Sequence, residues 1–403
     1  TAVTLYVDTI AAMVALVKAT LTDGQTIHVA GYTTRNDGGG GEFIWDASST
    51  ATVNTGTCFQ AAAGGTGRWI RFIKYSYVDV RWFNCLPDST SRSTEAQAAY
   101  DYVSSTGPYT PNELVFTGGY FNVNLTAHNA NINIIGIGKP QLRPDVSTTP
   151  VITLSNVETS YADPRLISGL HFSQNGTSHT GTAIYCAADV HHVKIQHCEF
   201  QFFDISIDRS NGNFGMYIRD CSFETSNYHI YSKDTATAHA GNVMITGGHM
   251  RSASKACFYI DSSLVSQAGM FIVRDVTIES NSGYVLFIKQ ADTTLTGVPT
   301  ITIESCWNEN NATSGSITVG GVTAVPTWGY VASCHGVRLL DTPFSVLTLV
   351  NATVMTRDCD LTYSYGSSVD SDSYLVHENA RYISYQNLNG LVKSVTNVEG
   401  TGL

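Results

Sequence analysis

Charged residues are scarce in this chain of 403 residues, in which Asp, Glu, Lys and Arg together account for 14%. Lys and Arg number 22 against 33 Asp and Glu, so the formal net charge is −11. Contacts to nucleic-acid phosphates require clustered Lys and Arg, and this balance therefore argues against a nucleic-acid partner. Glu- and Lys-rich helical stretches are also few, whereas Gly, Ser and Thr are abundant, which favours β structure.

Long apolar runs and metal-binding motifs are missing as well. No run approaches the ~20 apolar residues that cross a bilayer, and the opening segment TAVTLYVDTI lacks the basic and apolar regions of a signal peptide. The CxxC and HExxH spacings do not occur, so the sequence predicts no metal site and no cofactor. The nine cysteines are an odd number, and we expect reduced, packed thiols instead of a disulfide framework.

The chain does contain an internal repeat of eight residues. VKIQHCEF at 193–200 returns as MYIRDCSF at 216–223, VMITGGHM at 243–250 and FIVRDVTI at 271–278. Nine copies fit when they are aligned on their third residue, the anchor, which is Ile167, Ile195, Ile218, Ile245, Val273, Ile303, Leu339, Thr356 or Ile383. Their spacing of 17 to 36 residues is typical of a stacked β-solenoid with insertions of variable length.

Apolar and polar residues alternate within each copy, as they do in a strand with one buried face. The fifth residue after the anchor is large and apolar in all copies but one, which predicts an inward stack that includes Phe172, Phe200 and Phe223. A second short strand follows most copies, so each coil should contribute to at least two sheets. Because crossovers between parallel strands are overwhelmingly right-handed, the sequence predicts an all-β, right-handed parallel β-helix.

The chain before the repeats differs in kind. Residues 1–78 combine a helical pattern, strand-like segments and a glycine run at 38–41, which predicts a small α/β module with a flexible hairpin. Residues 79–112 should form a linker and an amphipathic helix over 93–104, with Ala96, Ala99, Tyr100 and Val103 inward. A solenoid must cover its open end, and this helix is the expected cap. The β-helix should then occupy 113–397, followed by a tail at 398–403.

Five segments in residues 6–83 occur in a familiar order: YVDTIAAMVAL, DGQTIHVAGY, DGGGGEFIWDASS, GRWIRF and VDVRWF. Together they closely resemble the N-terminal region of bacteriophage tailspike proteins with a pectate-lyase-like β-helix. Such tailspikes usually continue with GAKGDGxxDDTxAI before the capping helix, whereas this chain has FNCLPDSTSRSTEAQAAYDYV. The capping helix is thus present in outline, while the usual Gly/Asp turn is altered.

The resemblance implies a homotrimer on the virion, assembled in the host cytoplasm, that binds and usually cleaves bacterial surface polysaccharide. Its N-terminal module would join other components of the tail. Catalytic residues vary among tailspikes, so the resemblance identifies none of them. Many relatives also bear a C-terminal domain, but the repeat continues here to Leu388 and leaves about 15 residues, so we expect that domain to be absent or removed.

A row of ionisable residues makes the outer face the candidate active site. The sixth residue after the anchor is Glu224, Arg251, Glu279 and Glu309 in four consecutive copies. With coils stacked ~4.8 Å apart, Glu279 and Glu309 approach the ~5–5.5 Å of a retaining glycosidase, and Glu224 and Glu279 the ~6.5–9.5 Å of an inverting one. Like charge nearby raises one pKa and prepares a general acid. The competing interpretation is a solvated ladder of alternating charge.

Substrate-binding candidates lie around this row. His249 and Trp307 share a second outward row, where Trp307 would either stack on a sugar ring or, if its strand shifts by one residue, join the core. Asp234 and Asp261 could face the same groove, and a trimer could combine residues from two chains. The Asp two residues after the anchor, as in Asp220 and Asp275, is expected to form a bend.

Three classes of function follow. The preferred one is a glycan depolymerase that acts by hydrolysis, with Glu224, Glu279 and Glu309 as acid and base or nucleophile. The second is a polysaccharide lyase, in which Arg251 or His249 would neutralise a uronate. No Lys-rich or calcium-type Asp cluster supports the lyase, so hydrolysis is preferred. The third is a receptor-binding adhesin that holds the glycan without cleaving it.

Overall fold

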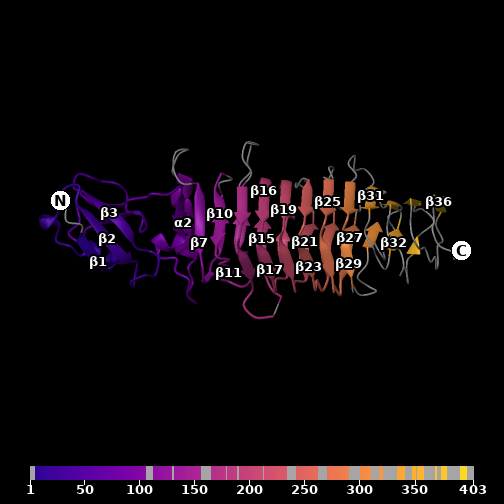
Figure 1. Cartoon of the computed structure of the whole chain (residues 1–403), viewed down its shortest axis with the longest axis horizontal. Coiled ribbons are helices and arrows are strands. Elements are labelled where there is room, and N and C mark those ends of the chain that lie inside the picture. The colour runs from indigo at the N-terminus through magenta and orange to yellow at the C-terminus, as the bar shows by residue number, and fades with distance from the viewer. Residues whose placement is uncertain are drawn as a thin grey trace.

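The computed structural model describes an elongated molecule with a small module at the N-terminal end and a long solenoid beyond it (Figure 1). The described residues are 5–105, 112–128, 131–155, 165–177, 179–187, 190–211, 213–233, 242–261, 270–289 and 300–309, and the strands within 317–320, 334–340, 347–350, 352–357, 368–369, 374–378 and 391–396. Among these residues no helix is long and apolar enough to span a membrane.

The N-terminal module is a five-stranded sheet in the order β1-β2-β3-β5-β4, with only β1 and β2 parallel. Its elements are β1 (Leu5–Thr9), α1 (Ile10–Val14), η1 (Lys18–Thr20), β2 (Thr26–Gly31), β3 (Gly41–Asp46), β4 (Cys58–Gln60) and β5 (Arg68–Arg71). Met13, Phe43, Trp45 and Trp69 form its buried centre.

The glycine run lies in the loop between β2 and β3. A Cβ atom on Gly40 would lie 2.3 Å from the carbonyl oxygen of Val29, and one on Gly39 would lie 2.5 Å from that of Arg81. Only glycine allows so close an approach between backbones. The run therefore permits tight packing of the loop on β2 and on the start of the β-helix.

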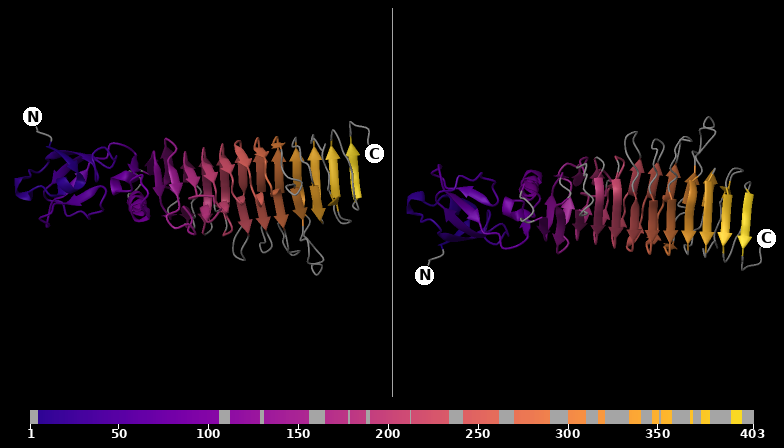
Figure 2. Two further views of the ribbon diagram at one scale, coloured as in Figure 1. Left: turned by 90° about the horizontal axis from the view of Figure 1, so that it is seen from below. Right: turned by 90° about the horizontal axis from the view of Figure 1, so that it is seen from above.

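Three parallel sheets make up the solenoid, and successive coils lie side by side along its length (Figure 2). Sheet 1 contains β6 (Tyr77–Asp79), β7 (Glu113–Thr117), β10 (Asn133–Ile137), β13 (Arg165–Ser168), β16 (Val190–Gln196), β19 (Asn213–Arg219), β22 (Val243–Thr246), β25 (Met270–Arg274), β28 (Thr300–Glu304), β31 (Cys334–Leu340), β33 (Ala352–Arg357), β35 (Tyr374–Glu378) and β36 (Leu391–Thr396). Sheet 2 contains β8 (Tyr120–Asn122), β11 (Gln141–Arg143), β14 (His171–Ser173), β17 (Glu199–Gln201), β20 (Ser222–Glu224), β23 (His249–Arg251), β26 (Thr277–Glu279) and β29 (Trp307–Glu309). Sheet 3 contains β9 (Leu125–Ala127), β12 (Ile152–Leu154), β15 (Thr182–Cys186), β18 (Ile205–Asp208), β21 (Tyr228–Lys233), β24 (Ala256–Asp261), β27 (Tyr284–Lys289), β30 (Ile317–Gly320), β32 (Leu347–Val350) and β34 (Ser368–Val369). The predicted parallel β-helix is confirmed.

Each eight-residue copy folds as a strand of sheet 1, a bend and a strand of sheet 2. The bend residue two after the anchor is left-handed, with φ of 50° at Asp220 and 55° at Asp275, which confirms the predicted bend. Gly169, His197, Gly247 and Ser305 hold the same place with φ between 53° and 71°. Asn, Asp and Gly tolerate this conformation best, so the Asp row serves the backbone.

The anchors pair in the predicted register from Ile167 through Leu339 to Thr356. The prediction that Ile383 is the ninth anchor was wrong. The next strand after β33 in sheet 1 is β35, which places His377 opposite Thr356. The segment 381–388 lies outside the described residues. Two earlier coils were missed, since Leu114 and Ile134 occupy the anchor position ahead of Ile167.

The interior is a continuous apolar column. Phe172, Phe200 and Phe223 stack with ring centres 5.0 and 4.7 Å apart and planes 5° from parallel. Cys198, Cys221 and Cys306 are buried beside them. The seven cysteines whose side chains the structure describes are free and buried, as the sequence predicted.

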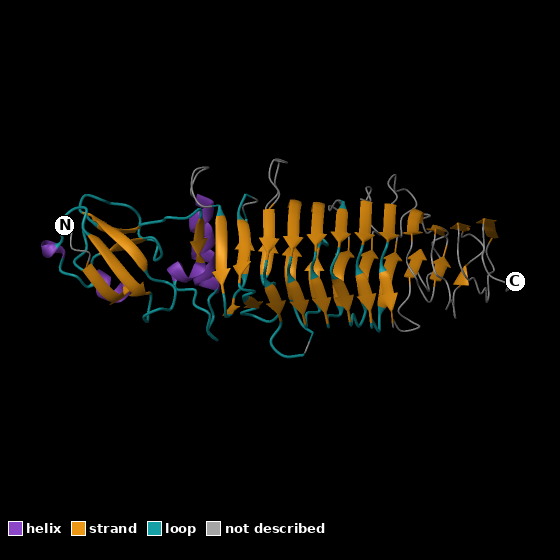
Figure 3. Ribbon diagram, viewed as in Figure 1, coloured by secondary structure: helices purple, strands orange, loops and turns teal. Residues whose placement is uncertain are grey.

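The predicted cap is α2 (Ser93–Ser105), which lies between the module and the first coils (Figure 3). Its buried residues are the four predicted ones, Ala96, Ala99, Tyr100 and Val103. The Ser93 hydroxyl donates to Asp145 at 2.9 Å and accepts from the backbone N–H of Asn124 at 2.8 Å, which fixes the helix on the β-helix. A short 3-10 helix, η2 (Val80–Phe83), precedes it.

Candidate functional site

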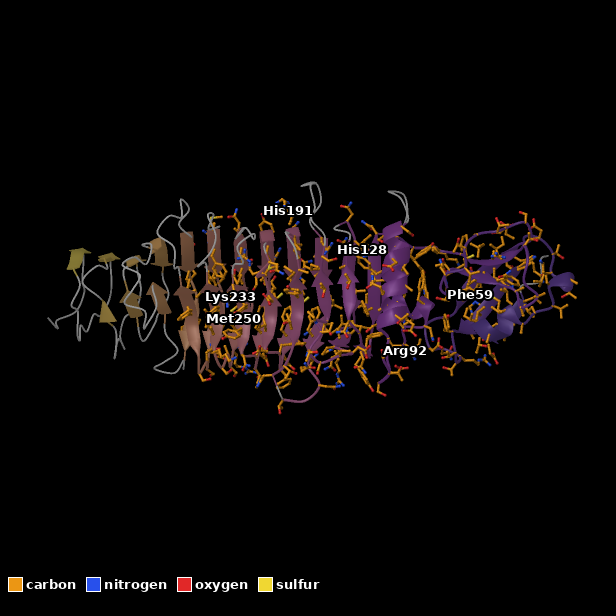
Figure 4. All side chains as sticks on the ribbon, turned by 180° about the vertical axis from the view of Figure 1, so that it is seen from behind. Phe59, Arg92, His128, His191, Lys233 and Met250 are labelled. Carbon is orange, nitrogen blue, oxygen red and sulfur yellow. The ribbon has the colours of Figure 1, made fainter. Side chains whose placement is uncertain are left out.

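Sheet 2 presents two outward columns of side chains on either side of its buried column. The first contains His171, Glu199, Ser222, His249, Thr277 and Trp307, and the second contains Gln201, Glu224, Arg251 and Glu279, with the buried Ser173 before them and the backbone of Glu309 after them. Met250, labelled in Figure 4, is the buried residue between His249 and Arg251. The outward side chains from β17 to β29 form the surface that we call the acidic face.

Glu224 is surrounded by hydrogen-bond donors. Arg251 Nη2 lies 3.1 Å from Glu224 Oε2, and Gln201 Nε2 donates to the same oxygen at 3.4 Å. The Ser222 hydroxyl donates to the other oxygen at 3.4 Å. The carboxylate is thereby held in one orientation beside a full positive charge, and Arg251 separates it from Glu279 along the column.

Glu279 and His249 form a second pair, across the two columns. His249 Nε2 lies 3.0 Å from Glu279 Oε1, and each side chain is 28% exposed. An imidazole and a carboxyl group at this distance are joined by a hydrogen bond, and both groups can take part in general acid–base chemistry. The sequence singled out both residues separately, but not their contact.

Glu199 and its cationic and polar neighbours form a third group at the other end of the acidic face. It binds Lys139 Nζ, and His171 Nδ1 lies 4.0 Å from its Oε2. His171 Nε2 also lies 3.3 Å from Gln201 Oε1, which continues the network to Glu224. The interpretation of the row as a solvated charge ladder fits this end of the acidic face, because each carboxylate here has a cationic or neutral hydrogen-bond donor beside it.

Trp307 stands exposed at the opposite end, with 59% of its surface accessible. The alternative shift of one residue does not occur, because Thr277 pairs with Trp307 and Ile278 with Asn308. Of the two expectations for Trp307, the outward one therefore holds. An exposed indole on the strand next to that of Glu279, with Thr277 between it and His249, can stack against an apolar sugar face.

Three predicted site residues are Glu309, Asp261 and Asp234. Glu309 keeps its backbone position opposite Glu279, and Asp261 ends β24 opposite Lys233 and Lys289. Their side chains, and the whole of Asp234, lie outside the described residues. Within the described part of the chain, no group of three or more His, Cys, Asp or Glu residues could hold a metal ion.

This architecture is similar to that of known phage tail proteins. Residues 6–74 match the family described as the phage tail protein small four-stranded β-sheet domain. The enzymatically active domain of tailspike protein 4 from bacteriophage CBA120 has a TM-score of 0.59 at 14% identity, over 96% of this chain and 52% of that one. Tailspike gp49 of Acinetobacter baumannii bacteriophage Fri1, described as a capsular polysaccharide depolymerase, has a TM-score of 0.57 at 13% identity, over 98% and 77%.

The chain has the fold of a phage tailspike. The tailspike protein of Acinetobacter baumannii phage AM24 is a further example, with a TM-score of 0.51 at 14% identity, over 96% of this chain and 65% of that one. This tailspike-type chain thus spans about half the length of the CBA120 structure. No curated protein sequence matches it.

The tailspike-type β-helix carries another polar feature that the sequence analysis missed. On sheet 3, Tyr185, Asp208, Tyr231, Tyr259 and Phe287 form one outward column. Burial raises the pKa of Asp208, although the Ser210 backbone N–H and hydroxyl donate to it at 2.9 and 2.6 Å. Aligning the second strands as strictly as the first would have revealed this column.

Proposed function

We propose that this chain is a component of a phage tail that binds bacterial surface polysaccharide, capsule or O-antigen, and depolymerises it by hydrolysis on the acidic face. The observation that supports this most is the grouping of exposed Trp307 with the His249–Glu279 pair on neighbouring strands. An aromatic platform holds a sugar ring, and the pair can transfer a proton. The likeness in fold to tailspikes, one of them a depolymerase, supports the choice of substrate.

Glu279 is the central catalytic residue of this proposal. It protonates the glycosidic oxygen as the leaving group departs, and His249 orients its carboxyl group. A second carboxylate activates water or attacks the sugar directly. Glu224, two strands away at about 9.6 Å of backbone spacing, suits the wider separation of an inverting enzyme. Glu309, one strand away, suits the shorter separation of a retaining enzyme.

Arg251 favours hydrolysis over elimination. A lyase needs a cation free to neutralise the uronate of its substrate, whereas the Arg251 guanidinium already lies 3.1 Å from Glu224. In the proposed hydrolase Arg251 fixes Glu224, and its remaining donors contact substrate hydroxyls. Asp261 and Asp234 would extend the binding surface beyond β24. The proposal also includes a homotrimer and attachment to the tail through the N-terminal module.

Glu279→Gln tests the catalytic assignment. The amide keeps the shape of the side chain but cannot donate the acid proton, so we expect at least an ~10²-fold loss of rate. Stability should change by only about 0.5 kcal/mol. The assay is release of reducing ends from purified capsule and O-antigen polysaccharides, with absorbance of unsaturated uronate recorded in parallel.

Glu304→Gln is the matched control, because Glu304 forms an exposed ion pair with Arg274 at 2.7 Å and belongs to sheet 1, not to the acidic face on sheet 2. It should retain full activity. Near-normal cleavage by Glu279→Gln would reduce the acidic face to a charge ladder. Unsaturated products would show a lyase, and bound but intact glycan an adhesin.

A further inference from the structure

A cavity of about 410 Å³ opens on sheet 3, at the start of β21, β24 and β27. Its lining includes Tyr228, Ser254, Lys255, Tyr259, Ser282 and Phe287. None of these residues belongs to the acidic face. The volume lies near the lower end of the ~300–1,000 Å³ typical of small-molecule sites, which suits a single sugar ring.

Aromatic rings form one wall of this cavity. Tyr259 stacks on Tyr231 and on Phe287, with ring centres 5.0 Å apart and planes within 7° of parallel in each case. Tyr228 meets Tyr259 edge to face at 5.4 Å. These rings are only partly buried, and their order is fixed by the 4.8 Å-scale stacking of strands. Because Tyr259 is covered on both faces by its neighbours, the stack presents the edges of its rings to the cavity.

Polar groups of opposite charge stand beside that wall. Lys255 Nζ lies 3.6 Å from Asp204 Oδ1 and 5.0 Å from the centre of the Tyr228 ring. Asn227 Nδ2 donates to Asp204 Oδ1 at 2.7 Å, and the Ser254 hydroxyl donates to Asn227 Oδ1. Lys255 in the lining thus offers an ammonium donor, Asp204 next to the lining offers a carboxylate acceptor, and their charges cancel.

We propose that this cavity is a subsite for one neutral hexopyranose unit of the polysaccharide. The apolar part of the sugar ring packs against the edges of Tyr259 and Phe287, while one hydroxyl accepts from Lys255 and a neighbouring one donates to Asp204 beside the lining. A uronate is disfavoured, because its carboxylate would stand beside Asp204 and Lys255 is already neutralised. The inference deepens the proposed function and rests on it for the polymer.

The position of the cavity connects it to the acidic face. Ser282 follows Glu279 by three residues, and Ser254 follows Arg251 by three. At most ~11 Å of extended chain separates each pair of Cα atoms. A polysaccharide that crosses the turns between sheets 2 and 3 would therefore contact both places, and the subsite would set which sugar lies next to the cleaved bond.

Saturation-transfer NMR on the intact protein tests the subsite. The probes are the methyl glycosides of glucose, galactose, mannose and N-acetylglucosamine, with methyl glucuronide as the charged comparison. At least one neutral probe should receive saturation, and more strongly than the glucuronide. Lys255→Met should weaken its binding about tenfold, because a charge-assisted hydrogen bond is lost. Lys194→Met, an exposed lysine on sheet 1, is the matched control and should bind normally.

The same titration in the Glu279→Gln protein separates this inference from the proposed catalysis. Unchanged binding there, together with loss at Lys255→Met, supports the subsite whether or not Glu279 proves catalytic. The subsite is refuted if no neutral glycoside binds, if the glucuronide binds best, or if Lys255→Met binds normally. A change of oligomeric mass in Lys255→Met without a change in binding would instead assign the cavity to contact between copies.

Discussion

Arg71 joins the N-terminal module to the β-helix, and replacing it tests how that junction is held. Its side chain is only 5% exposed. The guanidinium donates to the carbonyl oxygens of Gly56 at 2.9 Å, Gly40 at 2.5 Å and Gly39 at 2.8 Å. It also lies 4.5 Å from the ring centre of Phe43 and 4.9 Å from that of Trp82 in η2. One cation thus connects the glycine loop, the core of the module and the start of the solenoid.

Arg71→Met keeps the apolar stem and removes all five of these interactions. Each buried carbonyl left without a donor costs ~1–3 kcal/mol, and each cation–π contact contributes ~0.5–2 kcal/mol. Such terms are not additive within one cluster, and removing a buried hydrogen-bonded charge usually costs ~3–5 kcal/mol. We expect a loss within that range. Arg71→Lys should rescue little, because an ammonium cannot reach three carbonyls with the planar fork of arginine.

Calorimetry combined with limited proteolysis measures the effect. The transition of the N-terminal module should move to lower temperature and cleavage near residues 74–78 should accelerate, while the β-helix transition stays in place. Arg35→Met is the control, because Arg35 lies over the Tyr6 ring on the exposed surface of the same module. A loss below about 1 kcal/mol in Arg71→Met would show that apolar packing alone holds the junction.

Two further predictions concern acid sensitivity and assembly. Burial lowers the pKa of His229 from 6.5 to about 3. The contribution of the neutral imidazole to stability is therefore complete above pH 6.5 and is lost as pH falls towards 3. His229→Leu should flatten the fall of melting temperature between pH 6.5 and 4, and an unchanged slope would contradict this cause. Light scattering should give about three times the chain mass of 43.5 kDa, and a stable monomer at micromolar concentration would exclude the homotrimer.

The strands of sheets 1 and 2 could be predicted because each coil repeats the same backbone with the same inward positions. Phe172, Phe200 and Phe223 must occupy one column if their coils stack in register, and apolar size alone identifies that column. The earlier coils at Leu114 and Ile134 escaped because they precede the stretch where the eight-residue pattern is clear. The false copy at Ile383 arose where apolar alternation matched but strand pairing followed His377 instead.

Side-chain partners were harder to predict than columns, for a physical reason. Stacking fixes the distance between residues of one column, so Glu224, Arg251 and Glu279 were placed in order from sequence alone. The His249–Glu279 contact runs diagonally between columns, and its existence depends on side-chain rotamers that the repeat does not specify. Lys255 and Asp204 lie along one column, but they meet across two coils, past Asn227, and this contact also depends on the rotamer of a long side chain.

This distinction also explains where chemistry can arise on a solenoid. A residue type that recurs at one position of many coils, such as the Asp at the bend, is favoured by a backbone conformation that recurs at the same position. A residue that differs from its neighbours above and below does not meet such a recurring need of the backbone. From β14 to β29, Trp307 is the indole in a column whose other members are polar, and Lys255 stands between Asn227 and Gly283 just before its strand. The positions that break the repeat are therefore where substrate contacts should be sought, and Lys255→Met changes one of them.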